Sequence, residues 1–160
     1  MSYFGLFQSH ILYGILAWGH SSLVVDILLL QKKAIRNIAG VGPLTHCKPL
    51  FIEHQILTVV NLYLFHVLLY TKSNLQSFPM RMDIHTYNNR GRGKVDILQH
   101  RLAKTGNSLK LNSISFFNKL PDSAKFVNFA VFKKKLQNWL LLNPFYNLDE
   151  FVCCSIDVMF

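Results

Sequence analysis

The acidic residues are the first place to look for catalytic chemistry, and their spacing does not form a catalytic set. Eight Asp and Glu residues are scattered along the chain, and the one adjacent pair is Asp149-Glu150. Two-metal phosphoryl transfer requires several carboxylates that converge on a pair of divalent ions. No upstream strand offers a third carboxylate to this pair. We therefore predict no catalytic residues in this chain, and we interpret Asp149-Glu150 as a solvated acidic turn beside an aromatic side chain.

Histidine and cysteine residues could bind zinc, but their spacing is not that of a zinc site. His46, Cys47 and His54 are close in the sequence, and Cys153-Cys154 are adjacent. Zinc sites usually combine two pairs of ligands at short spacings, and the sequence offers no second pair. We therefore predict no metal site and no cofactor held by this chain. Three cysteines without regular spacing favour reduced thiols over a disulfide framework.

The basic residues are the remaining candidates for chemistry, and their chemistry would be phosphate binding. The chain has 17 Lys and Arg residues and a formal net charge of +9, of which residues 1–80 contribute +3, residues 81–135 +9 and residues 136–160 −3. Such a charge favours an acidic partner, either nucleic acid or an anionic membrane surface. A solvated surface would account for the same charges, so both interpretations stay open. The candidate phosphate-binding residues are Lys32, Lys33, Arg36, Arg90, Arg92, Lys94, Lys133, Lys134 and Lys135.

The elements that must position these residues are predicted to be mainly helical. Apolar residues make up 51% of the chain, which predicts a packed core. Apolar periodicity predicts helices over residues 2–17, 22–39, 54–72 and 128–142. Residues 40–49 are predicted to form a loop, and 109–117 a strand or a docked loop. The predicted buried face of the second helix consists of Leu23, Ile27, Leu30, Ala34 and Ile38, and the third helix should be the most buried element.

Two apolar runs, residues 3–18 and 56–70, raise the alternative of a small membrane-associated helical protein. A membrane-spanning helix needs about 20 apolar residues, and polar residues interrupt both of these shorter runs. We therefore expect buried core helices, and we do not expect a membrane as a partner. We expect the nucleus or the cytoplasm as the compartment, rather than secretion or a membrane.

Six stretches of the chain together form a recognisable series. They are Ser9-His10-Ile11-Leu12-Tyr13-Gly14-Ile15 with Trp18-Gly19; Leu30-Gln31-Lys32-Lys33-Ala34-Ile35-Arg36; Cys47-Lys48-Pro49-Leu50-Phe51 with Ile56-Leu57-Thr58-Val59 and Leu62-Tyr63; His85, Tyr87 and Arg90; Phe117-Asn118-Lys119-Leu120-Pro121; and Phe132-Lys133 with Phe145-Tyr146 and Glu150-Phe151. In order and spacing, this series resembles the region after the catalytic palm in non-LTR, jockey-like retrotransposon reverse transcriptases.

The resemblance implies a helical thumb-like bundle over residues 1–72, a basic irregular connection with possible short strands over 73–127, and a C-terminal helix with an acidic aromatic tail over 128–160. It also implies a fragment of an RNA-directed DNA polymerase that lacks the catalytic aspartates. The implied role is to hold RNA or an RNA–DNA duplex for a separate fingers–palm region that uses magnesium. A non-functional relic of a mobile element is the other alternative that this resemblance leaves open.

Overall fold

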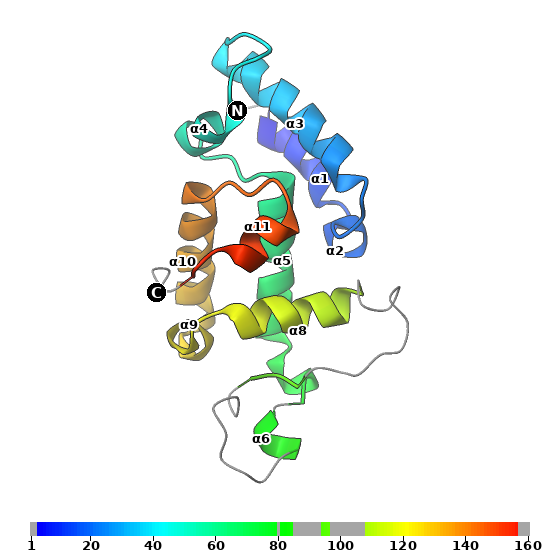
Figure 1. Ribbon diagram of the computed structural model, residues 1–160, viewed down its shortest axis with the longest axis vertical. Coiled ribbons are helices and arrows are strands. Elements are labelled where there is room, and N and C mark those ends of the chain that lie inside the picture. The colour runs from blue at the N-terminus through cyan, green and yellow to red at the C-terminus, as the bar shows by residue number, and fades with distance from the viewer. Residues whose placement is uncertain (1–2, 80, 85–93, 97–107, 157–160) are drawn as a thin grey trace. The chain divides into compact units, whose positions relative to one another are not determined.

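The computed structural model describes residues 3–79, 81–84, 94–96 and 108–156, and its described part is mainly helical (Figure 1). This confirms the predicted fold class. The chain divides into two compact units, which are described separately below: Met1–His66 with Leu136–Cys154, and Val67–Lys135 with Ser155–Phe160. The three regions predicted from the sequence remain predictions.

The first unit begins with short helical segments rather than with the single helix predicted over residues 2–17. They are the π-helical turn η1 (Tyr3–Gln8), α1 (Ser9–Leu12) and α2 (Ile15–Trp18). The prediction was wrong because Gly14 has a φ of 62°, a left-handed conformation that breaks the helix where only glycine adopts it at little cost. Gly19 follows α2 as its C-cap, and its N–H donates to the carbonyl of Ile15.

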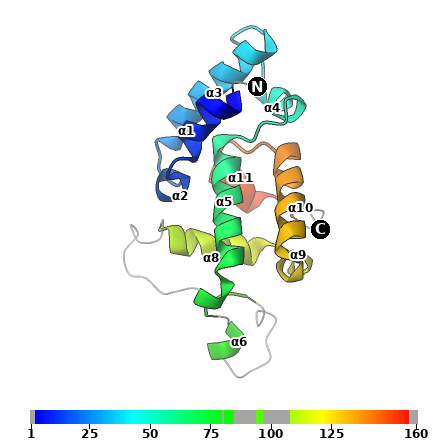
Figure 2. The same cartoon turned by 180° about the vertical axis from the view of Figure 1, so that it is seen from behind.

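Helix α3 (Val24–Ala39) runs beside α1 in both views of the molecule (Figures 1 and 2). Gly40 ends it with a φ of 64°, as predicted, and the N–H of Val41 donates to the carbonyl of Arg36. The predicted buried face was wrong by one residue. The face that is buried consists of Val24, Leu28, Gln31 and Ile35.

The reason for this shift is a polar residue inside the core. Gln31 is fully buried, and both polar atoms of its side chain have hydrogen-bond partners. Its Nε2 donates to the hydroxyl of Tyr3 at 2.7 Å and to the carbonyl of Leu57 at 2.8 Å, while its Oε1 accepts the N–H of Val59 at 2.8 Å. The exposed face of α3 therefore keeps large apolar residues, with Leu23 66% and Leu30 55% exposed.

Helices α4 (Cys47–Glu53) and α5 (Val59–Ser73) follow. The loop predicted over residues 40–49 ends early, because α4 begins at Cys47 and accommodates Pro49 in its first turn, where no backbone donor is needed. In the first unit, Tyr3, Ile35, Cys47, Leu50, Phe51 and Ile56 form a buried cluster. Residues Val59 to Phe65 are all buried, as predicted for the most buried helix.

The remaining elements lie mostly in the second unit, and two of them, α8 and α11, differ from the sequence prediction. The second unit contains the 3-10 turn η2 (Leu75–Ser77), α6 (Arg81–Ile84), α8 (Leu109–Lys119) and α9 (Asp122–Phe126). The predicted strand or loop over 109–117 is the helix α8, whose first turn is capped by Ser108. Helix α10 (Phe129–Leu142) confirms the last predicted helix. The prediction of a solvated acidic turn at Asp149-Glu150 was wrong, because both residues lie in the first turn of α11 (Leu148–Cys153) in the first unit and Glu150 pairs with Lys48.

Candidate nucleic-acid interface

The three basic residues of α3 do different things, although the sequence grouped them on one helix. Lys33 is exposed. Lys32 and Arg36 are partly buried, and the Arg36 Nε donates to the carbonyl of Thr45 at 2.9 Å, which ties the end of α3 to the following loop. Only Lys33 of this group is therefore fully available to a ligand.

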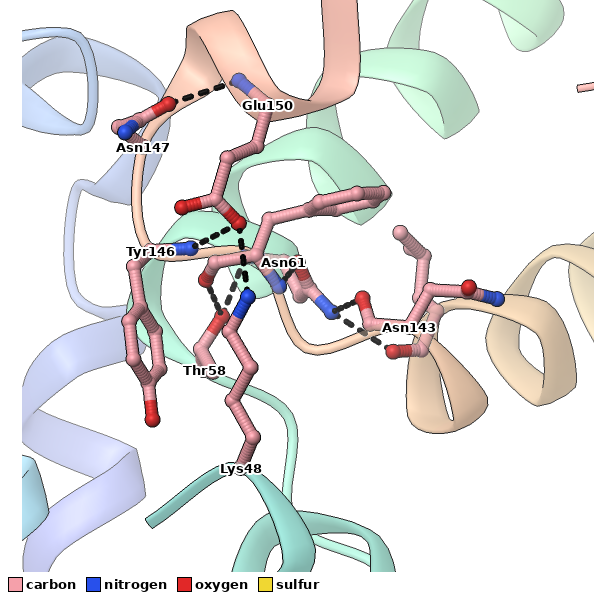
Figure 3. Close-up of polar contacts among 9 residues, drawn as sticks. Lys48, Thr58, Asn61, Asn143, Tyr146, Asn147 and Glu150 are labelled. Carbon is pink, nitrogen blue, oxygen red and sulfur yellow. Dashed lines mark hydrogen bonds and ion pairs between the residues drawn. The ribbon is translucent and has the colours of Figure 1, made fainter. Parts of the chain in front are cut away.

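Lys32 belongs to a cluster with Lys48, Tyr146 and Glu150, which we call the Tyr146 cluster. The Lys32 Nζ lies 3.5 Å from the centre of the Tyr146 ring, and the Lys48 Nζ lies 4.9 Å from it. Lys48 also pairs with the Glu150 carboxylate at 3.1 Å (Figure 3). Cation–π contacts of this kind hold the lysines against the ring. The cluster thus uses two lysines to fix the C-terminal segment rather than to present charge.

A second set of bonds in the first unit positions Tyr146 by holding the chain just before it. The Asn61 Nδ2 donates to the carbonyls of Leu140 at 2.7 Å and Asn143 at 2.9 Å, and the Asn61 Oδ1 accepts the N–H of Phe145 at 3.2 Å (Figure 3). Thr58 donates its hydroxyl to the carbonyl of Phe145 at 2.8 Å. Asn61 thereby satisfies a carbonyl at the end of α10 that has no partner within its own helix.

Burial changes the acid–base behaviour of the Tyr146 cluster. It lowers the pKa of Lys32 and raises the pKa of Tyr146 to about 12. The Tyr146 hydroxyl oxygen is buried and has no hydrogen-bond partner among the described residues, so nothing offsets its loss of hydration. The unfolded chain would release this proton near pH 10. Stability should therefore fall as the pH rises from about 10 towards 12.

We expect Tyr146→Phe to reduce the tyrosine component that ionises near pH 12, and Tyr3, whose pKa burial also raises, should keep its own share of the high-pH absorbance. Absorbance at the tyrosinate band, followed against pH, measures this directly. Tyr13→Phe is the matched control, because Tyr13 is 86% exposed. This control should leave the component near pH 12 in place. An undiminished amplitude of that component in Tyr146→Phe would contradict the assignment.

Lys33 and Arg36 line a shallow cavity at the C-terminal end of α3. Its volume is about 200 Å³, and Asn37, Val41 and Pro43 complete the lining. The Lys33 ammonium, and the Arg36 N–H groups other than the Nε–H that Thr45 accepts, can contact a phosphate oxygen there. In the described part of the first unit, this cavity offers basic side chains to a ligand.

Lys94 is exposed on a short segment that is held in place rather than on a free loop. Asn118 of α8 holds the neighbouring Val95 twice, accepting its N–H at 2.8 Å and donating to its carbonyl at 2.8 Å. The N–H of Arg81 donates to the Lys94 carbonyl, and Arg81 also pairs with Asp96 at 3.7 Å. The other two predicted residues of this loop, Arg90 and Arg92, lie outside the described residues.

Lys133, Lys134 and Lys135 are all exposed on α10. Two further lysines of the second unit, Lys72 and Lys125, make internal contacts. Lys125 is buried and pairs with Asp122 at 2.8 Å, and Lys72 donates to the carbonyl of Lys125. The sequence count of basic residues therefore overstates the number of lysines open to a partner.

The sequence prediction missed the residues that organise these surfaces. Gln31, Asn61 and Asn118 each bond backbone groups far away in the sequence, and no local pattern marks them. Lys48 could have been found from its place in the stretch Cys47-Lys48-Pro49, but its partner Glu150 lies about a hundred residues further on.

Cysteine and histidine do not gather into a metal site in the part of the chain that the structure describes. Cys47 is buried, and its Sγ contacts the carbonyls of Lys32 and Thr45. No group of three His, Cys, Asp or Glu side chains that could hold a metal ion occurs among the described residues. Within those same residues, no helix has the length and apolarity to cross a membrane.

Comparison with known proteins finds no family model, no curated protein and no solved structure that matches the chain. The candidate interface therefore rests on its own geometry and on the series of sequence stretches described above.

Proposed function

We propose that this chain is the thumb and post-thumb region of a non-LTR retrotransposon reverse transcriptase. It is non-catalytic by itself, and it contributes template–primer binding to RNA-directed DNA synthesis. The observation that carries the proposal is the exposure of Lys33, Lys94, Lys133 and Lys134, whereas Lys48, Arg81 and Lys125 form ion pairs with carboxylates of the chain. The ordered series of sequence stretches supports the same role.

Phosphate contacts explain what such exposed lysines can do. A lysine ammonium is a point charge that attracts phosphate without reading the base sequence. The expected ligand is therefore RNA or an RNA–DNA duplex, bound with little sequence preference. This ligand would be met in the nucleus or the cytoplasm.

The exposed apolar face of the first unit supports packing against a fingers–palm region. A cavity of about 520 Å³ lies between α3 and the N-terminal segments, and it is lined by Phe7, His10, Ile11, Tyr13, Trp18, Ile27 and Leu30. Large exposed apolar patches usually mark interaction sites. In this proposal the face is covered by the part of the polymerase that carries the catalytic aspartates.

Among the described residues, no group of three His, Cys, Asp or Glu side chains could hold the magnesium of the parent polymerase. Magnesium prefers carboxylate oxygens, yet Asp149 is exposed and Glu150 is paired with Lys48. In this proposal the metal is bound by the catalytic region, and no step of the chemistry passes through this chain.

A gel-shift and primer-extension experiment on one sample tests both halves of the proposal. The purified chain is mixed with a primed RNA template, deoxynucleotides and magnesium. We expect the RNA–DNA hybrid to migrate more slowly in the presence of the chain, and we expect the primer to stay unextended. Template-dependent synthesis would contradict the absence of an active site, and a hybrid that is not retained would contradict the binding role.

A further inference from the structure

The corner between α9 and α10 in the second unit combines exposed aromatic rings with lysines. Phe126, the last residue of α9, is 82% exposed, and Phe129, the first residue of α10, is 43% exposed. Two residues separate them, and the two helices meet at this corner in both views (Figures 1 and 2). A large apolar side chain that remains this exposed contributes little to the core, so its role must be sought at the surface.

The geometry of α10 places lysine beside these rings. Phe129 and Lys133 are four residues apart, so they are neighbours on one face of the helix. Lys134 lies beside Lys133, and both are exposed. The Asn128 side chain accepts the N–H of Ala130 at 3.0 Å, which fixes the start of the helix and with it the position of Phe129. The corner thus places Phe129 and Lys133 on one face of α10 and Lys134 on the adjoining face.

The positive charge of this corner indicates which class of partner it can bind. Residues 126–148 contain no Asp or Glu, and Asp122, the acidic residue of α9, is paired with Lys125 at 2.8 Å. An anionic ligand with flat apolar faces complements both features at once. Unpaired nucleic-acid bases stack on aromatic rings, and their phosphates pair with lysines. Duplex bases are already stacked inside the helix and offer only phosphates to the same surface.

We propose that the Phe126–Phe129 corner binds single-stranded nucleic acid, with bases stacked on the two rings and phosphates held by Lys133 and Lys134. This inference rests on the proposed function, because it assigns the unpaired strand next to the template–primer duplex to a separate surface. It predicts that the two aromatic residues contribute to the affinity for single strands alone, while the two lysines contribute to the affinity for both single strands and duplexes.

The test compares two labelled ligands of one sequence, a single-stranded RNA and an RNA–DNA duplex, by fluorescence anisotropy. Phe126→Ala should weaken single-strand binding about tenfold and leave duplex binding unchanged. Phe126→Leu keeps the apolar bulk but not the ring, so it should lose as much single-strand affinity as Phe126→Ala. Circular dichroism checks that both variants fold as the wild type does, as the exposure of this side chain predicts.

The outcomes separate this inference from the proposed function. Wild-type protein that binds neither ligand would overturn both. Wild-type protein that binds the duplex, with equal single-strand affinity in Phe126→Ala, would overturn the corner alone. Retained single-strand affinity in Phe126→Leu would also overturn it, since no ring would then be needed. Phe126→Ala could instead leave both nucleic-acid affinities unchanged and lower only the fraction of protein that sediments with phosphatidylserine vesicles. That result would assign the corner to an anionic membrane surface.

Discussion

Asn61→Leu is expected to lower the free energy of unfolding by about 3 kcal/mol, because it removes a buried amide that serves three backbone groups. Asn61 is fully buried, and it bonds the carbonyls of Leu140 and Asn143 and the N–H of Phe145. Leucine has nearly the same size but leaves all three groups without partners. Each such group costs about 1 kcal/mol or more when it is buried. Urea unfolding followed by circular dichroism measures the change.

Two further variants make this result specific. Asn61→Asp keeps the shape but places a second acceptor against the carbonyls of Leu140 and Asn143, so it should cost at least as much as leucine at neutral pH. Asn138→Ala is the matched control, because Asn138 is an exposed residue of α10. Its effect should stay within about 0.5 kcal/mol. A loss below about 1 kcal/mol in Asn61→Leu would contradict the role assigned to this amide.

Gly19→Ala is the second substitution with a large expected effect, and its cause is steric. A Cβ at this position would lie 2.6 Å from the carbonyl oxygen of Ile15 and 2.7 Å from the Cγ of Tyr63, and closer still to the Tyr63 Cδ2. Tyr63 is fully buried, so a shift of its ring must displace other core side chains. Overpacking of this kind typically costs 1–3 kcal/mol, and we expect about 3 kcal/mol here.

Gly5→Ala provides the comparison for this substitution. A Cβ at Gly5 meets nothing within 4 Å, so alanine should be neutral or slightly stabilising. Thermal unfolding of the two variants side by side gives the measurement. Equal melting temperatures for Gly19→Ala and Gly5→Ala would mean that α2 does not pack against Tyr63 as described.

The sequence predicted those parts of the fold whose signals are local. Gly40 at the end of α3 and Pro144 after α10 mark helix ends by their own backbone chemistry, and the continuous apolar composition of α5 predicted its burial. The face of α3 was predicted wrongly because Gln31 is polar in type but fully buried in fact. A helix face is predicted on the rule that buried positions are apolar. A polar residue that is buried because its hydrogen bonds are made inside the core does not follow this rule.

Helix α8 shows a second limit of local patterns. Its apolar residues alternate imperfectly in the sequence, which suggested a strand, but Leu111, Ile114 and Phe117 share one buried helical face. Ser108, whose hydroxyl accepts the N–H of Leu111, was the signal that could have decided in favour of a helix. At the candidate interface, the sequence identified the lysines but not which of them pair internally, since pairing depends on residues brought together by folding.

The central claim is that the exposed lysines bind nucleic-acid phosphates. Its most direct test is the salt dependence of binding to an RNA–DNA duplex, measured for the wild type and for the combined variant Lys133→Ala and Lys134→Ala. Each lost phosphate contact should lower the slope of log affinity against log salt by roughly 0.7 to 0.9, so the variant should lose about 1.5 in slope. Lys48→Gln is the control, because the charge of Lys48 is already paired with Glu150, and it should leave the slope nearly unchanged. Identical slopes for the wild type and the combined variant would contradict the account.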